Sequence, residues 1–96
     1  MTCFIARLKV KPGREADFER LQRELSELTH QHEPDTYSYD VIRHRTEPGV
    51  YVVYARFKDE ASFQAHQTTS FHDRRHQPIV DTLAGDMDLQ FFDWIS

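Results

Sequence analysis

The 96-residue sequence has a single cysteine, Cys3, which excludes an internal disulfide. A lone cysteine is typical of a small buried side chain in a protein of the reducing cytoplasm. No apolar run approaches the roughly 20 residues of a membrane-spanning helix, and the N-terminus lacks the basic start and apolar stretch of a signal peptide. No stripe of Lys and Arg is present, and the net charge is −4. We therefore expect a cytoplasmic protein that contacts neither membranes nor nucleic acids.

Apolar spacing predicts the order strand, helix, strand, strand, helix, helix, strand within a single domain that spans residues 1–96. The expected elements cover residues 3–10, 14–32, 36–44, 50–58, 59–67, 70–83 and 86–94. The middle hairpin and the two helical crossovers favour an α+β fold. It is the ferredoxin-like arrangement, a four-stranded antiparallel sheet with helices on one face.

The first helix is expected to bury one stripe of side chains and to pair charges on its outer face. The expected stripe consists of Phe18, Leu21, Leu25, Leu28 and His32. On the outer face, Arg23 is spaced to pair with both Glu19 and Glu27, one turn away on either side.

Cap and breaker residues set the limits of the two later helices. Asp59 is the expected N-cap of the second helix, and Ser70 with Asp73 that of the third. Pro78 predicts a kink or a split in the third helix, and Gly85 predicts its end.

The strands carry apolar side chains on both faces. Tyr37, Tyr39 and Val41 are expected to share one face of the second strand. The third strand alternates Tyr51, Val53, Ala55 and Phe57 with Val50, Val52 and Tyr54. Because the helices cover only one face, the other face would leave an apolar patch that includes Val50, Phe92 and Trp94. A patch of this kind predicts a homodimer in which two sheets close face to face about a two-fold axis.

Three motifs follow one another along the chain: KVKPG at residues 9–13, FKDEASFQAH at 57–66 and TTSFH at 68–72. In their order and spacing the whole chain resembles the antibiotic biosynthesis monooxygenase family. The resemblance implies a ferredoxin-like domain that dimerises into an α+β barrel, with a pocket between sheet and helices. It also implies oxidation of quinols, anthrones or similar polyaromatic phenols by O2 without a cofactor. Other members cleave haem or process a signalling sugar, and many have no assigned activity.

The chain departs from the family pattern at several positions. Family members often carry Glu-x-Trp at the end of the third strand, where this chain has Ala55-Arg56-Phe57, and the usual His-Phe occurs here as Phe71-His72. The haem-degrading branch uses an Asn, a Trp and an axial His at the positions of Ala6, His66 and His76. Only the axial histidine is retained. Haem binding therefore stays an alternative, whereas two of the three residues that the haem-degrading branch uses are absent.

Three histidines are the candidate catalytic residues: His66, His72 and His76. The last two lie at i and i+4, and Ile79 and Leu83 continue the row at i+7 and i+11, which predicts that both histidines point inward. Three interpretations are open. The histidines can be core-edge groups satisfied by backbone or tyrosine partners, groups for ligand binding or proton transfer, or a metal pair without an evident third ligand.

His66 suits the chemistry that the resemblance implies. A histidine titrates near neutrality and can take a phenolic proton, after which the electron-rich anion can pass an electron to O2. The candidate substrate-binding residues are Tyr39, Tyr51, Phe57 and Phe71. We therefore predict a cofactor-independent monooxygenase that acts on a quinol- or anthrone-like aromatic and has no metal site. The alternatives are a haem or small-molecule binding module without oxygenase chemistry, and a non-catalytic dimeric domain.

Overall fold

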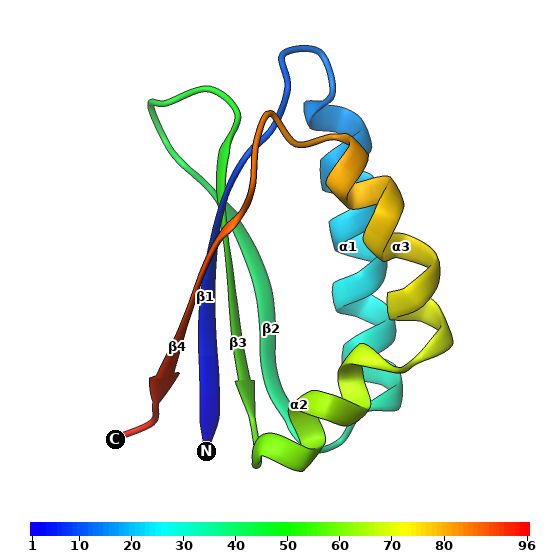
Figure 1. Ribbon diagram of the computed structural model, residues 1–96, viewed down its shortest axis with the longest axis vertical. Helices are drawn as coiled ribbons and strands as arrows, with labels where there is room; N and C mark the ends of the chain where they lie inside the picture. The colour runs from blue at the N-terminus through cyan, green and yellow to red at the C-terminus, as the bar shows by residue number, and fades with distance from the viewer.

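The computed structural model describes residues 1–96 and contains four strands and three helices (Figure 1). In chain order these are β1 (Thr2–Lys9), α1 (Glu15–His32), β2 (Thr36–Arg43), β3 (Val50–Phe57), α2 (Glu60–Gln67), α3 (Ser70–Asp81) and β4 (Asp88–Asp93). The expected order and type of the elements are confirmed, although α3 and β4 are shorter than the sequence predicted.

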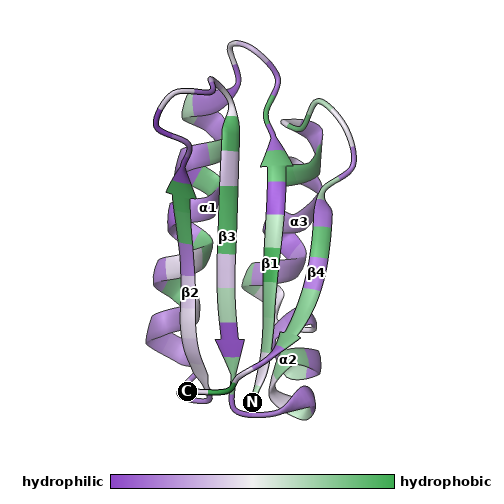
Figure 2. Ribbon diagram, turned by 90° about the vertical axis from the view of Figure 1, so that its left-hand side faces the viewer, coloured by the Kyte–Doolittle hydropathy of each residue, from purple (hydrophilic) through white to green (hydrophobic).

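The strands form one antiparallel sheet in the order β2-β3-β1-β4, which confirms the predicted ferredoxin-like fold. All three helices lie behind the sheet in Figure 2, so one face of the sheet is left open. Helix α1 packs along β2 and against α3, whereas α2 lies across the end of the sheet near the N-terminus (Figure 1). None of the helices has the length and apolar character needed to span a bilayer.

The core lies between the inner face of the sheet and the helices. Successive side chains of a strand point to opposite faces, so alternate residues of β1 and β3 enter the core. On these two strands the buried inward set is Phe4, Ala6, Leu8, Tyr51, Val53, Ala55 and Phe57. Phe18 of α1 is fully buried against Tyr51, with ring centroids 4.5 Å apart, and this contact holds α1 on the sheet.

The buried stripe of α1 differs from the expected one. Its fully buried residues are Phe18, Gln22, Leu25 and Thr29. Leu28 is only half-buried and His32 is exposed. The expected stripe was chosen by the apolar residues alone. A helix has about 3.6 residues per turn, so the positions that share the face of residue 18 are 22, 25 and 29. Two polar side chains, Gln22 and Thr29, therefore take inward positions.

The expected ion pairs of Arg23 with its neighbours on α1 do not form. Glu19 turns toward the sheet instead, where its Oε2 accepts a hydrogen bond from the Tyr51 hydroxyl at 2.6 Å and pairs with Arg43 at 3.1 Å. An exposed i,i+4 pair contributes only a few tenths of a kcal/mol, so the hydroxyl of the buried Tyr51 and a strand guanidinium compete successfully for the carboxylate.

A β-bulge at the start of β2 overturns the expectation that Tyr37 shares a face with Tyr39. Thr36 pairs with Phe57 and Ser38 with Arg56, which leaves Tyr37 as an extra residue. One inserted residue reverses the face of the side chains before it. Tyr37 is therefore exposed on the open face of the sheet.

Helix α3 differs from the expectation at both ends. Thr69, not Ser70, is the N-cap, and its hydroxyl accepts a hydrogen bond from the backbone N–H of His72. The helix is not split at Pro78, because the carbonyl that loses its partner belongs to the exposed Arg74 and can bind water. The helix ends at Asp81 rather than near Gly85.

The open face of the sheet carries a row of apolar side chains. Those that remain exposed are Ile5, Tyr37, Ile42, Phe92 and Trp94. The guanidinium of Arg56 lies 4.1 Å from the ring centroid of Trp94, and every residue of β4 is exposed. Val50 was expected in this patch but is buried. Its register partner is Lys9, whose ammonium group donates a hydrogen bond to the carbonyl of Pro48.

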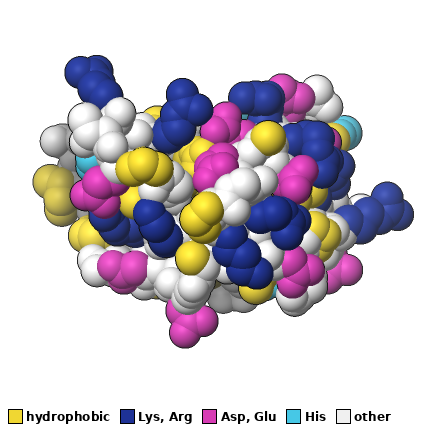
Figure 3. All heavy atoms as spheres, turned by 90° about the horizontal axis from the view of Figure 1, so that it is seen from above, with side chains coloured by type: hydrophobic (Ala, Val, Ile, Leu, Met, Phe, Trp, Pro, Cys, Tyr) yellow, Lys and Arg dark blue, Asp and Glu magenta, His cyan; other side chains and the backbone are white.

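The end of the molecule that carries the β2–β3 loop shows acidic and basic side chains interspersed (Figure 3). No continuous basic patch forms on this end, in agreement with the charge distribution of the sequence. The apolar patch on the open sheet face is therefore the more distinctive surface of the protein.

The burial of Phe18 predicts a large effect on stability. We expect Phe18→Ala to lower the free energy of unfolding by about 3–5 kcal/mol, because the substitution leaves a cavity against Tyr51. Urea denaturation at fixed protein concentration measures the change. Ile95→Ala is the control, since Ile95 is 90% exposed and should change the value by less than about 0.5 kcal/mol. Equal effects of the two substitutions would contradict this description of the core.

Candidate active site

An apolar cavity of about 140 Å³ lies between the inner face of the sheet and helices α2 and α3. Hydrophobic side chains such as Phe4, Phe63 and Ile79 form most of its wall. Its polar lining consists of Tyr39, Gln22, Gln67, His66, His72 and His76. The structure thus brings the three histidines together with Tyr39 in one cavity, as a catalytic or binding site requires.

Helix α2 directs His66 into this cavity. Asp59 caps the helix, because its Oδ1 accepts a hydrogen bond from the backbone N–H of Ser62 at 2.8 Å. One side of the following turns packs on the sheet and buries Phe63 and His66. The His66 ring, 2% exposed, stands 4.8 Å from the ring of Tyr39.

Glu33 holds the Nδ1 side of the His66 ring. The two carboxylate oxygens of Glu33 lie 2.9 and 3.0 Å from Nδ1, and one of them also accepts a hydrogen bond from the Thr36 hydroxyl at 2.9 Å. A carboxylate only accepts hydrogen bonds, so Nδ1 must carry the proton. The carboxylate–histidine pair therefore fixes the tautomer of neutral His66.

The other ring nitrogen of His66, Nε2, is buried and has no hydrogen-bond partner. In the tautomer that Glu33 selects, Nε2 carries the lone pair, and His66 is one of the residues that line the cavity. Buried polar atoms are nearly always satisfied, so an orphaned acceptor in a cavity indicates a place for a ligand donor. His66 is thus arranged as an acceptor for a proton or hydrogen bond from a bound molecule.

Glu33 was not among the residues predicted from the sequence. It is the C-cap residue of α1 and directly precedes Pro34, and this position drew attention only to the end of the helix. Its contact with His66 spans 33 residues of sequence and has no local spacing pattern. The available signal was an acidic residue next to a helix-ending proline, which is too common to single out.

His72 and His76 extend from His66 toward solvent along α3. The rings of His66 and His72 have centroids 4.8 Å apart, and those of His72 and His76 are 5.7 Å apart. Exposure rises along the series, from buried His66 through half-buried His72 to exposed His76. Burial, together with the nearby His66 and His76, lowers the pKa of His72 from 6.5 to about 4, so His72 is neutral at physiological pH.

Tyr39 also lines this cavity, and its hydroxyl is neutral. Burial raises its pKa from 10.0 to about 12, and a hydrogen bond with Gln22 opposes this shift only in part. A phenol that stays protonated can donate a hydrogen bond to an oxygen atom of a ligand. Tyr39 therefore adds a donor to the acceptor that His66 provides.

The other predicted substrate-binding residues lie outside this cavity. Phe57 is fully buried and supports the ring of His66 at a centroid distance of 5.5 Å. Phe71 packs instead against His32, at 5.9 Å. The Tyr51 hydroxyl is bound to Glu19, and burial followed by this hydrogen bond raises its pKa to about 12.

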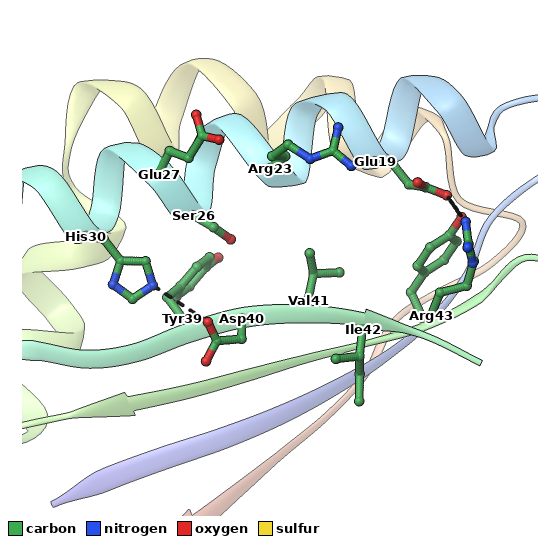
Figure 4. Close-up of a pocket in the computed structure, with 11 residues that line it drawn as sticks. Glu19, Arg23, Ser26, Glu27, His30, Tyr39, Asp40, Val41, Ile42 and Arg43 are labelled. Atoms are coloured by element: carbon green, nitrogen blue, oxygen red, sulfur yellow. Dashed lines mark hydrogen bonds and ion pairs between the residues drawn. The ribbon is translucent and has the colours of Figure 1, made fainter. Parts of the chain in front are cut away.

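A second, more open hollow of about 370 Å³ separates α1 from the edge strand β2 (Figure 4). At one end Tyr51 and Arg43 share the carboxylate of Glu19, and at the other His30 Nε2 lies 3.7 Å from an oxygen of Asp40. At the first end the three groups satisfy one another. The unpartnered buried atom of this hollow is the Ser26 hydroxyl, which is far less basic than an imidazole nitrogen. The cavity beside His66 is therefore the better candidate for catalysis, although it is the smaller of the two.

Neither a metal centre nor haem matches the residues at the site. No group of three or more His, Cys, Asp or Glu side chains is placed to hold a metal ion. The cavity of about 140 Å³ lies below the roughly 300–1,000 Å³ of sites for larger ligands. Ala6 offers no polar group, and His76 is at the exposed rim. These residues do not fit a haem group.

Comparison with known proteins shows which family and which solved structures the chain resembles. The sequence model described as antibiotic biosynthesis monooxygenase matches residues 1–77. A candidate antibiotic biosynthesis monooxygenase from Caulobacter crescentus CB15 is 26% identical, with a TM-score of 0.94 over 99% of this chain and 90% of that chain. A candidate of the same kind from Nitrosomonas europaea is 20% identical, with a TM-score of 0.94 over the whole of both chains, and shows the shared fold. No curated protein matches the chain.

The lowered pKa of His72 predicts acid sensitivity of the fold. Between pH 6.5 and about 4, folded His72 binds fewer protons than unfolded His72, so the free energy of unfolding falls as the pH is lowered through this window. We expect His72→Gln to lose less stability than the wild type between about pH 7 and about pH 5, as measured by urea unfolding. His30→Gln, which changes an exposed histidine on α1, should keep the wild-type slope. A His72→Gln slope equal to that of the wild type would contradict the assignment.

Proposed function

The chain belongs to the antibiotic biosynthesis monooxygenase family, and on this premise we propose that it is a cofactor-independent monooxygenase acting on a quinol- or anthrone-like aromatic with O2. The observation that carries the proposal is the unpartnered Nε2 of His66, buried in an apolar cavity while Glu33 holds Nδ1. Such a nitrogen is a general base directed at a bound molecule.

His66 starts the reaction by taking a proton from the substrate at Nε2. The imidazolium that forms is stabilised by the Glu33 carboxylate at 2.9 Å. The substrate anion passes one electron to O2, and the radical pair combines to a peroxide anion. The protonated His66 returns its proton from Nε2 to this anion, which gives the hydroperoxide. For an anthrone, loss of water from the peroxide converts CH2 to C=O, so one oxygen atom ends in the carbonyl and the other in water. The substrate supplies all the electrons, and no external reductant enters the balance.

The shape and polarity of the cavity suit a small aromatic substrate. Phe4 and Phe63 meet edge to face at 6.0 Å in its wall, the geometry in which further aromatic rings pack well. The neutral hydroxyl of Tyr39 can donate to a phenolic or carbonyl oxygen of the substrate. Of the two named substrate types, a cavity of about 140 Å³ favours a quinol of one or two rings over a three-ring anthrone.

We further propose that the protein acts as a homodimer in the cytoplasm. The exposed row on the open sheet face, which includes Phe92 and Trp94, is too apolar for a free surface, and two such faces can close about a two-fold axis into an α+β barrel. The unbridged Cys3 suits a reducing compartment.

Oxygen uptake with 1,4-dihydroxynaphthalene and with anthrone tests the catalytic proposal. We expect His66→Gln to lower kcat by about 10²–10⁴-fold, the usual contribution of a general base, and Glu33→Gln to lower it by a smaller factor. His30→Gln is the matched control and should leave uptake unchanged, because His30 lies in the other hollow. Undiminished uptake in His66→Gln would remove the proposed base. Binding of both compounds without oxygen uptake would identify a binding module instead.

Light scattering after gel filtration tests the dimer. The wild type should have about twice the 11.4 kDa mass of one chain, and Trp94→Asp should shift it toward one chain because a buried unpaired charge is costly. Gln64→Asp adds the same charge on the exposed side of α2 and should leave the mass unchanged. A monomeric wild type would refute this part of the proposal.

A further inference from the structure

We propose that Tyr39 determines the size of the substrate, because its side chain is the wall between the cavity beside His66 and the larger hollow between α1 and β2. The inference rests on the proposed function and narrows the substrate to a quinol of one or two fused rings. Tyr39 is the one residue that lines both spaces. It therefore stands where a cavity of about 140 Å³ and a hollow of about 370 Å³ meet.

The two spaces lie side by side along the same stretch of α1. Gln22 and Leu25 line the cavity, whereas the residue after each of them, Arg23 and Ser26, lines the hollow. Successive residues of a helix differ in direction by about 100°, so this stretch of α1 faces both spaces. In Figure 4 the Tyr39 side chain rises from β2 toward α1, and Ser26 points toward it from the helix. The wall thus extends from the strand to the helix.

Contacts on the cavity side hold Tyr39 in this position. The Phe4 ring meets it edge to face at a centroid distance of 6.4 Å, and the His66 ring lies at 4.8 Å. Burial raises the pKa of Tyr39 to about 12, and a hydrogen bond with Gln22 opposes the rise, as expected of an amide that donates to the phenol oxygen. The Tyr39 residue is only 5% exposed, so the packed surroundings keep its ring in place.

The two volumes indicate what the wall does to a substrate. Sites for larger organic ligands occupy roughly 300–1,000 Å³, so the hollow falls within this range and the cavity below it. A substrate that reacts at His66 must place its reacting ring in the cavity. A third fused ring then has no buried place, because Tyr39 closes the way into the hollow, and at the rim beside the exposed His76 it would stay in water without gaining apolar burial.

Oxygen uptake gives the first test, through the ratio of kcat/KM for anthrone to kcat/KM for 1,4-dihydroxynaphthalene. Tyr39→Phe keeps the ring and should leave this ratio near the wild-type value. Tyr39→Ala removes the ring and should raise the ratio by about 10–200-fold, the range over which apolar pockets discriminate by size. Both variants lack the hydroxyl, so the difference between them reports the ring alone.

Refilling the hollow distinguishes loss of the wall from a general loosening of the core. The Ser26 hydroxyl is buried without a partner, so a larger side chain at this position enters the hollow. Ser26→Phe should return the ratio of Tyr39→Ala to the wild-type value and should leave the ratio of the wild type unchanged. If urea denaturation shows that Tyr39→Ala does not fold, Tyr39→Leu replaces it, because leucine keeps apolar bulk but is shorter than tyrosine.

Binding without turnover separates failure of this inference from failure of the proposed reaction. The probes are naphthalene-2-sulfonate and anthracene-2-sulfonate, which differ by one fused ring, and fluorescence titration gives the Kd of each. Tyr39→Ala should bind anthracene-2-sulfonate about 10–200-fold more tightly, relative to naphthalene-2-sulfonate, than Tyr39→Phe does, and Ser26→Phe should remove this gain. If the wild type takes up no oxygen but the relative affinity shifts in this way, the monooxygenase proposal fails and the role of Tyr39 stands. The inference is overturned if Tyr39→Ala and Tyr39→Phe have the same relative affinity, or if neither probe binds.

Discussion

The contact between the Glu33 carboxylate and Nδ1 of His66 decides the chemistry of this site. At 2.9 and 3.0 Å, with a side chain that is only 13% exposed, the carboxylate leaves neutral His66 a single tautomer. Without it the ring would be another core histidine, free to present either nitrogen. With it, Nε2 is a defined acceptor inside an apolar cavity. The catalytic proposal depends on this assignment.

The fold brings the two partners together from separate crossovers. Glu33 lies where α1 ends and the chain turns into β2, and His66 lies near the end of α2, after β3. The antiparallel pairing of β2 with β3 places Thr36 opposite Phe57, so the residue before β2 and the helix after β3 meet at the same end of the sheet. Thr36 then fixes the carboxylate through its hydroxyl, at 2.9 Å. The bulge at Tyr37 keeps both Thr36 and Tyr39 on the inner face.

The sequence predicted the parts of the fold that depend on local pattern. Alternation in residues 50–57 identified the inward face of β3, and Asp59 was recognised as a cap, because both signals act within a few residues. The Tyr37 bulge escaped prediction because its cause is the pairing with β3 rather than the spacing within β2. Within the site, spacing on α3 placed His72 and His76 on one row, but Glu33 was missed because its partner is distant in sequence. A single chain leaves the open face of the sheet uncovered, and every residue of β4 is exposed.

The ring tautomer of His66 tests the central claim most directly. Nitrogen-15 NMR of the imidazole rings at neutral pH distinguishes a protonated nitrogen from one with a lone pair. We predict that neutral His66 is protonated at Nδ1 and carries its lone pair at Nε2, and that Glu33→Gln makes the populations of the two tautomers more equal. A wild-type His66 protonated at Nε2 would contradict it, because the acceptor in the cavity would then be absent.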